Sequence, residues 1–110
     1  VPSKHLITRR TNILNEEIFD NIIHPFYDIS IKRKHDCHAE HIGWTCGEYV
    51  FGELSMDSRF TNKSYFIYTL AHEMIHQWQW MQLNKTDHGR SFMKWKSKLN
   101  KFEIPLGVYI

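Results

Sequence analysis

The segment TLAHEMIHQWQWMQLNKTDHGRSF, from Thr69 to Phe92, decides the fold expected for this chain. It holds three of the eight histidines, and two of them, His72 and His76, form the pattern His-Glu-x-x-His. No Gly or Pro interrupts the sequence from about Ser64 to Leu83, and apolar residues recur there at helical spacing, which predicts a helix. Because residues four apart lie on one helix face, His72 and His76 should point the same way.

The apolar residues of this predicted helix mark the face that packs into the core. Placed at steps of about 100°, they form one broad stripe whose centre lies nearly opposite His72 and His76. The stripe consists of Ile67, Leu70, Ala71, Met74, Ile75, Trp78 and Met81. The two histidines are therefore expected to point out of the core and to share a metal ion. Solvated surface histidines and core histidines are the alternatives.

A catalytic zinc ion usually has three protein ligands and an open fourth position. His88 is the best candidate for the third ligand, because it stands in the first turn of a predicted last helix from Asp87 or His88 to about Phe102. The inward stripe of that helix carries His88 with it and contains Phe92, Trp95, Leu99 and Phe102. Asp87 and Glu103 are alternative ligands, although Asp87 projects about 100° from the stripe and Glu103 lies near the helix end.

Glu73 directly follows the first histidine, so it projects to the edge of the histidine face. Its carboxylate could reach a water on the metal without binding the metal itself. Zinc lowers the pKa of such a water toward 7, and Glu73 would take the proton as the water attacks a carbonyl. A purely structural zinc would not need this carboxylate, so the pattern favours a catalytic site.

The remaining segments predict a small α+β domain covering residues 1–110, with the order helix, strands, helix, helix. A first amphipathic helix is expected from Asn12 to Tyr27, after which the chain forms a basic connection. Two or three short antiparallel strands should lie between about Ala39 and Met56, with Gly47-Glu48 as a turn. The final residues, LGVYI (106–110), could form one more short strand.

Composition limits the classes of protein to consider. The 110 residues are 42% hydrophobic and 15% aromatic, which is typical of a folded domain. No apolar run approaches the roughly 20 residues of a membrane span, and the first ten residues do not resemble a signal peptide. Cys37 and Cys46 are too few for a disulfide framework, although one hairpin disulfide would be feasible. The cytoplasm or another reducing compartment is therefore expected, with the nucleus in a eukaryotic cell, and a viral source would fit as well.

A net charge of +2 is too small to indicate nucleic-acid binding by itself. The basic residues do cluster, and the clusters are more typical of solvated faces than of phosphate contacts. They are Arg9 and Arg10, Lys32, Arg33 and Lys34, and Lys94, Lys96, Lys98 and Lys101.

A second group of potential ligands precedes the active-site segment. It consists of His35, Cys37, His38, His41 and Cys46. No Cys-x-x-Cys pair anchors it, so a loop and strand start with solvated histidines is favoured over a second metal site. Three residues, His41, Tyr65 and Tyr68, are candidates for oxyanion or substrate contacts, although packing is the more common role. Among the tryptophans, Trp78 and Trp95 fall on apolar stripes, whereas Trp80 lies off the stripe and could flank a cleft.

Two segments resemble the SprT-like zinc metalloproteases, the Spartan-type HExxH proteases. The segment TLAHEMIHQWQ (69–79) resembles the active-site helix of that family, and DHGRSFMKWKSKLNKF (87–102) resembles the segment that follows, in which His-Gly-x-x-Phe supplies the third ligand. The resemblance implies a minimal zincin-like α+β fold and one Zn²⁺ ion. It also implies His72, His76 and His88 as ligands and Glu73 as the catalytic acid/base.

The function expected from residues and resemblance together is that of a zinc-dependent endopeptidase. Its substrate would be a protein or peptide, and the resemblance adds DNA-associated proteins as a substrate class. The alternative is a noncatalytic module in which the same zinc stabilises a binding surface for DNA or a protein partner. Metzincins fit less well, because their pattern requires Gly where this chain has Gln79.

Overall fold

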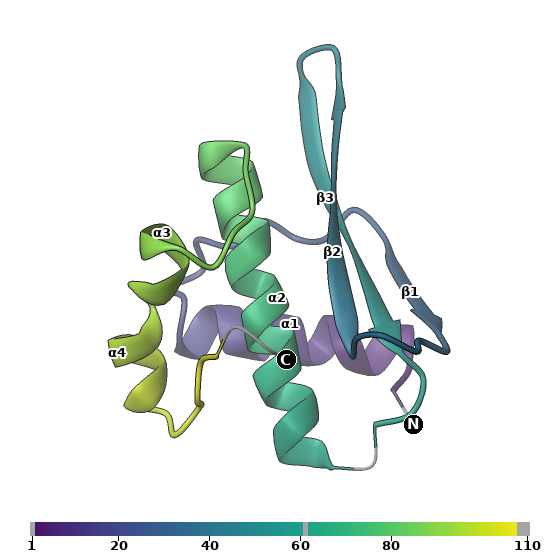
Figure 1. The fold of residues 1–110 in the computed structure, drawn as a ribbon, viewed down its shortest axis with the longest axis vertical. Helices are drawn as coiled ribbons and strands as arrows, with labels where there is room; N and C mark the ends of the chain where they lie inside the picture. Colours follow the sequence, from purple (N-terminus) through teal and green to yellow (C-terminus); the bar gives the residue numbers. More distant parts are fainter. Residues whose placement is uncertain (1, 61, 108–110) are drawn as a thin grey trace.

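Helix α2 (Lys63–Leu83) runs through the centre of the fold, and the other elements pack around it (Figure 1). The computed structural model describes residues 2–60 and 62–107. A three-stranded sheet lies on one side of α2, and the short helices α3 (Arg90–Met93) and α4 (Lys96–Asn100) lie on the opposite side. Helix α1 (Lys4–Glu17) crosses a third side. This arrangement confirms the predicted α+β class.

The bounds of α2 agree with the helix predicted from about Ser64 to Leu83. The side chain of Asn62 caps the start by accepting a hydrogen bond from the backbone N–H of Tyr65. Asn84 ends the helix in the left-handed conformation, with φ 56°. Both asparagines flank the apolar pattern, so local sequence chemistry fixes this element.

The first helix was predicted in the wrong place, because α1 starts at Lys4 and already ends at Glu17. Ser3 caps it by accepting from the backbone N–H of Leu6. The residues predicted to continue the helix form a loop in which Asp20 and Asn21 have positive φ. Asn15 holds this loop: its side chain donates to the carbonyl of Ile23 and accepts from its N–H, at 2.9 and 3.1 Å.

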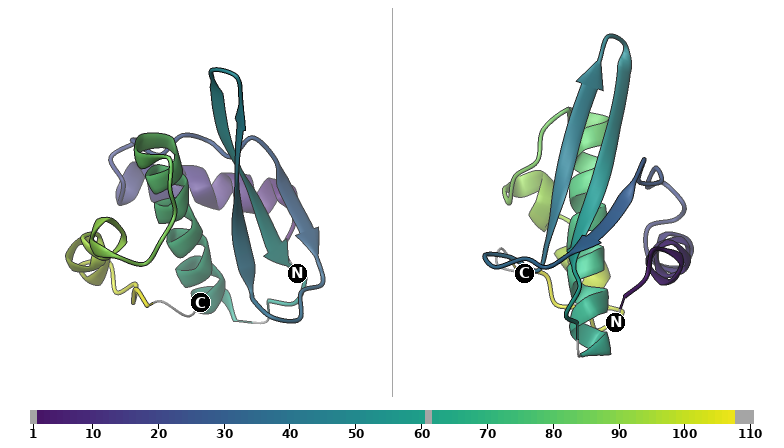
Figure 2. Two further views of the ribbon diagram at one scale, coloured as in Figure 1. Left: turned by 45° about the horizontal axis from the view of Figure 1, so that its top comes forward. Right: turned by 90° about the vertical axis from the view of Figure 1, so that its right-hand side faces the viewer.

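The sheet contains the predicted hairpin and one additional strand. Strands β2 (Ala39–Cys46) and β3 (Tyr49–Asp57) pair antiparallel, and Gly47 turns between them with φ 61°. Strand β1 (Ile29–Lys32), predicted only as a basic connection, pairs with β3 in parallel, so the sheet is mixed and ordered β1-β3-β2. The hairpin projects beyond the body of the domain (Figure 2).

The single last helix predicted from Asp87 to Phe102 is instead two short helices after a loop. The break lies at Trp95, whose N–H bonds to the carbonyl of Phe92, three residues back rather than four. The Trp95 ring packs edge-on against Phe19 and Trp78, at 5.2 and 5.5 Å between centroids, so tertiary packing sets the local backbone. Phe102, predicted to point inward, is 42% exposed. The predicted final strand falls largely on residues outside the described part, and 106–107 are not in a strand.

The core forms where α2 meets α1, the sheet and the C-terminal helices. Leu70, Ala71, Met74 and Ile75 on α2 are fully buried, as the apolar stripe predicted. Each fully buried large aliphatic side chain contributes about 1.5–3 kcal/mol, so this stripe fixes α2 firmly in the domain. In residues 2–60 and 62–107, no helix combines the length and hydropathy that crossing a membrane requires.

Candidate metal centre

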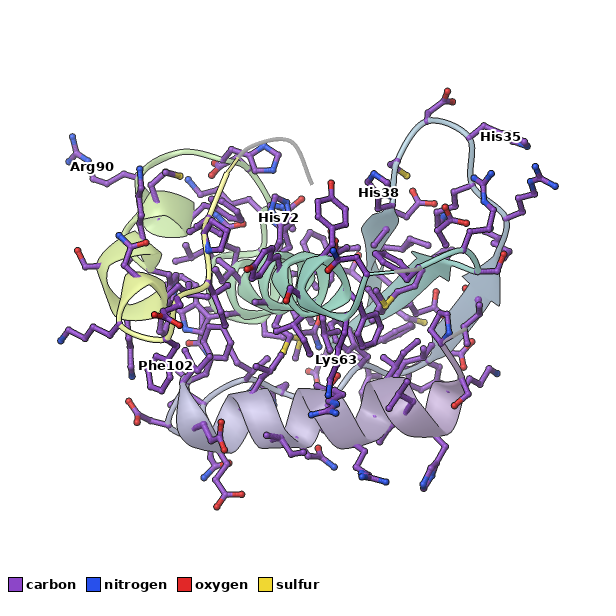
Figure 3. All side chains as sticks on the ribbon, turned by 90° about the horizontal axis from the view of Figure 1, so that it is seen from below. His35, His38, Lys63, His72, Arg90 and Phe102 are labelled. Carbon is purple, nitrogen blue, oxygen red and sulfur yellow. The ribbon has the colours of Figure 1, made fainter. Side chains whose placement is uncertain are left out.

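The structure brings together three histidines that lie apart in the sequence. His72 and His76 stand one turn apart on α2, and His88 comes from the loop before α3. Their Nε2 atoms form a triangle in which each side measures 3.2 Å. In Figure 3, His72 lies on the side of α2 that faces away from α1.

The triangle fits a tetrahedral metal ion. Nitrogens at about 2.0–2.1 Å from a tetrahedral zinc lie about 3.3–3.4 Å from one another, close to the observed sides. Three mutually close Nε2 atoms cannot satisfy one another by hydrogen bonds, because each nitrogen either donates or accepts and two of the three must share a role. Three imidazoles whose Nε2 atoms converge on one point are a donor set for a cation. Among the described residues, this is the group of histidine, cysteine or carboxylate side chains close enough to hold a metal.

Two of the histidines are buried, although they point away from the apolar core stripe as predicted. His72 is 4% and His76 is 7% exposed. They do point away from the apolar stripe, but the loop of His88 and the ring of Phe92 cover them. The helix periodicity gave their direction correctly and could not show that a later segment of the chain closes over them.

Burial keeps these two histidines neutral. Loss of hydration lowers the pKa of His72 to about 3, helped by the neighbouring His76 and His88, while the backbone of Gly107 opposes the shift. Loss of hydration also lowers the pKa of His76 to about 4, against the effect of its hydrogen bond to Gln79. A neutral imidazole is the form that binds a metal, so the site is ready for a cation at neutral pH.

Glu73 lies beside this cluster and is only 4% exposed. Burial raises its pKa to about 8, and the negative charge of Glu40 adds to this, while Lys34 lowers it. Within residues 2–60 and 62–107, no hydrogen bond or ion pair holds its carboxylate. A cation at the histidines would favour the ionised form, so the properties of Glu73 are coupled to the metal site.

A cleft of about 250 Å³ opens over the cluster. One wall is the start of strand β2, whose outer edge pairs with no other strand of residues 2–60 and 62–107. The cleft is lined by Ala39, Glu40, His41, His72, Glu73, His76, Thr86 and His88. The backbone of Asp57 bonds to the carbonyl of His38, so the pairing register directs the N–H and C=O groups of Ala39 and His41 toward this outer edge.

The alternative ligands do not join the cluster. Asp87 accepts hydrogen bonds from the backbone N–H of Gly89 and from Gln79. The bond from Gly89 lowers the pKa of its carboxyl most, and Lys85 and Gln79 lower it further. Glu103 lines a different pocket, between α1, the start of α2 and the C-terminal segment. His88 is thus the third member of the described triangle.

The second histidine and cysteine group does not assemble into a metal site among the described residues. Cys37 and Cys46 are both free and exposed, so the hairpin disulfide is absent from this structure. The ring of His38 packs against Phe60 and Tyr65. From this group, only His41 reaches the cleft, and its Nε2 bonds to Gln77 at 2.7 Å.

The remaining aromatic candidates lie away from the cleft. Tyr65 packs on His38, and Tyr68 lines the pocket beside α1. Trp78 and Trp95, which were predicted to lie on apolar stripes, pack against each other. Trp80, expected to flank a cleft, covers Gly43 and donates a hydrogen bond to the carbonyl of Phe51, so it joins α2 to the hairpin.

Several of the clustered basic residues have partners within the protein. Lys34 is buried and pairs with Glu40 at 2.9 Å. Lys98 pairs with Asp20 at 2.6 Å, and Lys94 lies over the ring of Trp78. DNA contact by the basic clusters stays a prediction.

Two polar residues of α2 have a structural role that the sequence pattern did not predict. Gln77 is 1% exposed and Gln79 is fully buried, and both make several side-chain hydrogen bonds. Gln79 stands three residues after His76, a spacing that places both side chains on one helix face. That spacing was the available signal, although the partners of Gln79 come from a loop whose position the sequence did not define.

A known protein family matches almost the whole chain. The model of the SprT-like family matches residues 7–109, from the first turn of α1 to the C-terminal segment. No curated protein matches the sequence significantly. The match confirms the resemblance that the segments at 69–79 and 87–102 indicated. With its helix, sheet and histidine cluster in one continuous match, the chain belongs to the SprT-like family.

Proposed function

We propose that this protein is a zinc-dependent endopeptidase in which His72, His76 and His88 hold the metal and Glu73 is the general base. One observation carries the proposal: three histidine Nε2 nitrogens form a tetrahedral face beside a buried carboxylate, in a cleft bounded by the outer edge of β2. When bound, zinc would supply Lewis acidity for the attacking water and the scissile carbonyl.

Glu73 would carry the proton in this reaction. Its carboxylate would take a proton from the attacking water and return it to the departing amine. Because Glu73 is buried and free of ion pairs within the described residues, its carboxylate can change protonation state without breaking a structural contact. A cation at the histidines would favour the ionised carboxylate, which is the form that a general base needs.

The outer edge of β2 would bind the substrate as an additional strand. The outward backbone groups of Ala39 and His41 can pair with an extended peptide, which would place its main chain across the cleft. Main-chain pairing of this kind selects an extended or unfolded segment and reads few side chains. The proposed substrate class is therefore a flexible segment of a protein.

The noncatalytic binding module is the alternative, and Glu73 argues against it. The Glu73 side chain is 4% exposed and lines the cleft beside the histidines, a position from which a structural zinc site gains nothing. A catalytic site does use the buried group. The burial of Glu73 therefore favours the enzyme over the module.

The test measures zinc content first and peptide cleavage second. Wild-type protein should contain one equivalent of zinc, and His88→Ala should lose most of it while keeping its circular dichroism spectrum. Glu73→Gln should keep zinc and fold but cleave an unfolded protein substrate at least about 100-fold more slowly. Zinc binding with equal cleavage by wild type and Glu73→Gln would reject the proposed mechanism, and a wild type that binds no zinc would reject the metal site.

A further inference from the structure

The amide of Gln79 connects the two parts of the histidine cluster. Its Oε1 accepts hydrogen bonds from Nδ1 of His76 at 2.7 Å and from the backbone N–H of Asp87 at 3.3 Å. Its Nε2 donates to Oδ1 of Asp87 at 3.2 Å and to Oγ of Ser91 at 2.9 Å. All the donors and acceptors of a carboxamide are thus used in a fully buried position.

These partners define the orientation of the amide. The backbone N–H of Asp87 can only donate, and the carboxylate of Asp87 can only accept, so the oxygen and nitrogen of Gln79 cannot be exchanged. The oxygen therefore faces His76, and Nδ1 of His76 carries the proton. Nε2 of His76 is then the unprotonated nitrogen, and it is the atom that lies in the triangle.

The same amide fixes the loop that carries His88. Gln79 holds Asp87 through both its backbone N–H and its carboxylate, and that carboxylate also accepts from the N–H of Gly89 at 3.0 Å. The residues on both sides of His88 are thereby held, although His88 itself lies outside any helix or strand. Ser91, the fourth partner, lies in α3, just after this loop.

We infer that Gln79 is a positioning residue that sets the tautomer of His76 and the location of His88 together, so that a helix ligand and a loop ligand meet one metal ion. This inference rests on the proposed metal function and assigns a residue outside the His-Glu-x-x-His pattern to it. No side chain of the described residues hydrogen-bonds to Nδ1 of His72, and the group that affects this imidazole by hydrogen bonding is the backbone of Gly107. The connection through the Gln79 amide therefore joins His76 to His88 and does not include His72.

Gln77 offers a matched control on the same helix. It is also buried, and it also uses both ends of its amide, bonding to His41 and to the carbonyls of His24 and Pro25. None of these partners belongs to the triangle. Gln79→Leu and Gln77→Leu should therefore lose comparable stability, but only Gln79→Leu should change the metal site.

The experiment measures zinc affinity by competition with a chromophoric chelator on folded protein. Gln79→Leu should bind zinc about 10- to 100-fold more weakly than wild type, and Gln77→Leu should stay within about threefold. If Gln79→Leu does not fold, Gln79→Glu replaces it, because a carboxylate keeps the acceptor for His76 and loses the donors to Asp87 and Ser91. It should weaken zinc binding about tenfold.

A second measurement does not depend on the metal. In metal-free wild type, the ¹⁵N–¹H spectrum of the imidazoles should show His76 protonated at Nδ1, and this signal should vanish in Gln79→Leu but persist in Gln77→Leu. His76 protonated at Nε2 in the wild type would overturn the inference.

The two possible failures can be told apart. If wild type binds zinc and Gln79→Leu or Gln79→Glu binds it as tightly as Gln77→Leu, the positioning role is wrong and the proposed function stands. If wild type and His72→Ala both bind no zinc, the proposed function fails, and the inference fails with it.

Discussion

The ring of Phe92 lies against the imidazole of His76, with the ring centroids 4.9 Å apart and the planes at 28°. The same ring meets His72 and His88 edge-on, at 4.8 and 4.9 Å. Phe92 is fully buried, so it forms the apolar floor against which all three histidines rest. It links the stability of the domain to the shape of the cluster.

Phe92→Ala should therefore lower both stability and zinc affinity. Removing a buried phenylalanine costs about 3–5 kcal/mol of the free energy of unfolding, and the cavity would let the three rings move apart. Urea unfolding of metal-free protein and chelator competition measure the two effects. Phe102→Ala, at an exposed phenylalanine of the same segment, should cost less than about 1 kcal/mol and leave zinc affinity unchanged. Equal losses in the two variants would contradict this role of Phe92.

Gly43→Ala should destabilise the contact between the hairpin and α2. A Cβ at Gly43 would lie 2.4 Å from Cε2 of Trp80, and the indole is held by its hydrogen bond to Phe51. Overpacking against a fixed ring costs about 1–3 kcal/mol, measurable as a lower denaturant midpoint. Thr45→Ala, at an exposed position of the same strand, should change stability by less than about 0.5 kcal/mol. Adding Trp80→Leu to Gly43→Ala should recover part of the loss, and no recovery would show that the clash lies elsewhere.

Glu73→Gln should change how the stability of the metal-free protein depends on pH. The folded pKa of Glu73 is raised to about 8 from 4.5, so between these values the folded state binds more protons than the unfolded state. The contribution of Glu73 to the stability of the folded state is thus fully present below about pH 4.5 and is lost as the pH rises through 8. Each pKa unit corresponds to about 1.4 kcal/mol, so the advantage of Glu73→Gln over wild type should grow by a few kcal/mol from pH 5 to pH 8.

Chemical unfolding at several pH values in the presence of a chelator measures this difference. Glu16→Gln removes an exposed glutamate of α1 and should follow the wild-type curve. A constant difference between Glu73→Gln and wild type across this range would mean that Glu73 is hydrated in the metal-free protein.

Lys34 and Glu40 should be energetically coupled. The ammonium group of Lys34 is almost fully buried and lies 2.9 Å from the half-exposed carboxylate of Glu40. Glu40→Gln leaves a buried charge without its counter-ion, so it should destabilise by about 1–2 kcal/mol. Lys34→Met combined with Glu40→Gln should cost about 1 kcal/mol less than the sum of the single changes. Strict additivity in a double-mutant cycle would show that solvent screens the pair.

Much of the centre of the fold was predictable because the information is local. The apolar stripe of α2, its asparagine caps and the four-residue spacing of His72 and His76 are all properties of one helix. The turn at Gly47 likewise fixed the pairing of the strands beside it. The first helix was misplaced because Leu14, Ile18, Ile22 and Phe26 keep a four-residue spacing beyond the end of α1, although Ile22 is exposed and Asn15 holds these later residues in a loop.

Sequence alone determined the types of residue that meet in the candidate site and the direction in which α2 presents two of them. Tertiary structure decided that His88 closes the triangle from a loop, that His72, His76 and Glu73 are buried, and that Gln79 connects His76 to the loop of His88. The physical reason is the range of the interactions. Helical periodicity acts over one turn and can be read from neighbouring residues, whereas the burial, the pKa shifts and the partners of the Gln79 amide come from segments that meet only when the chain has folded.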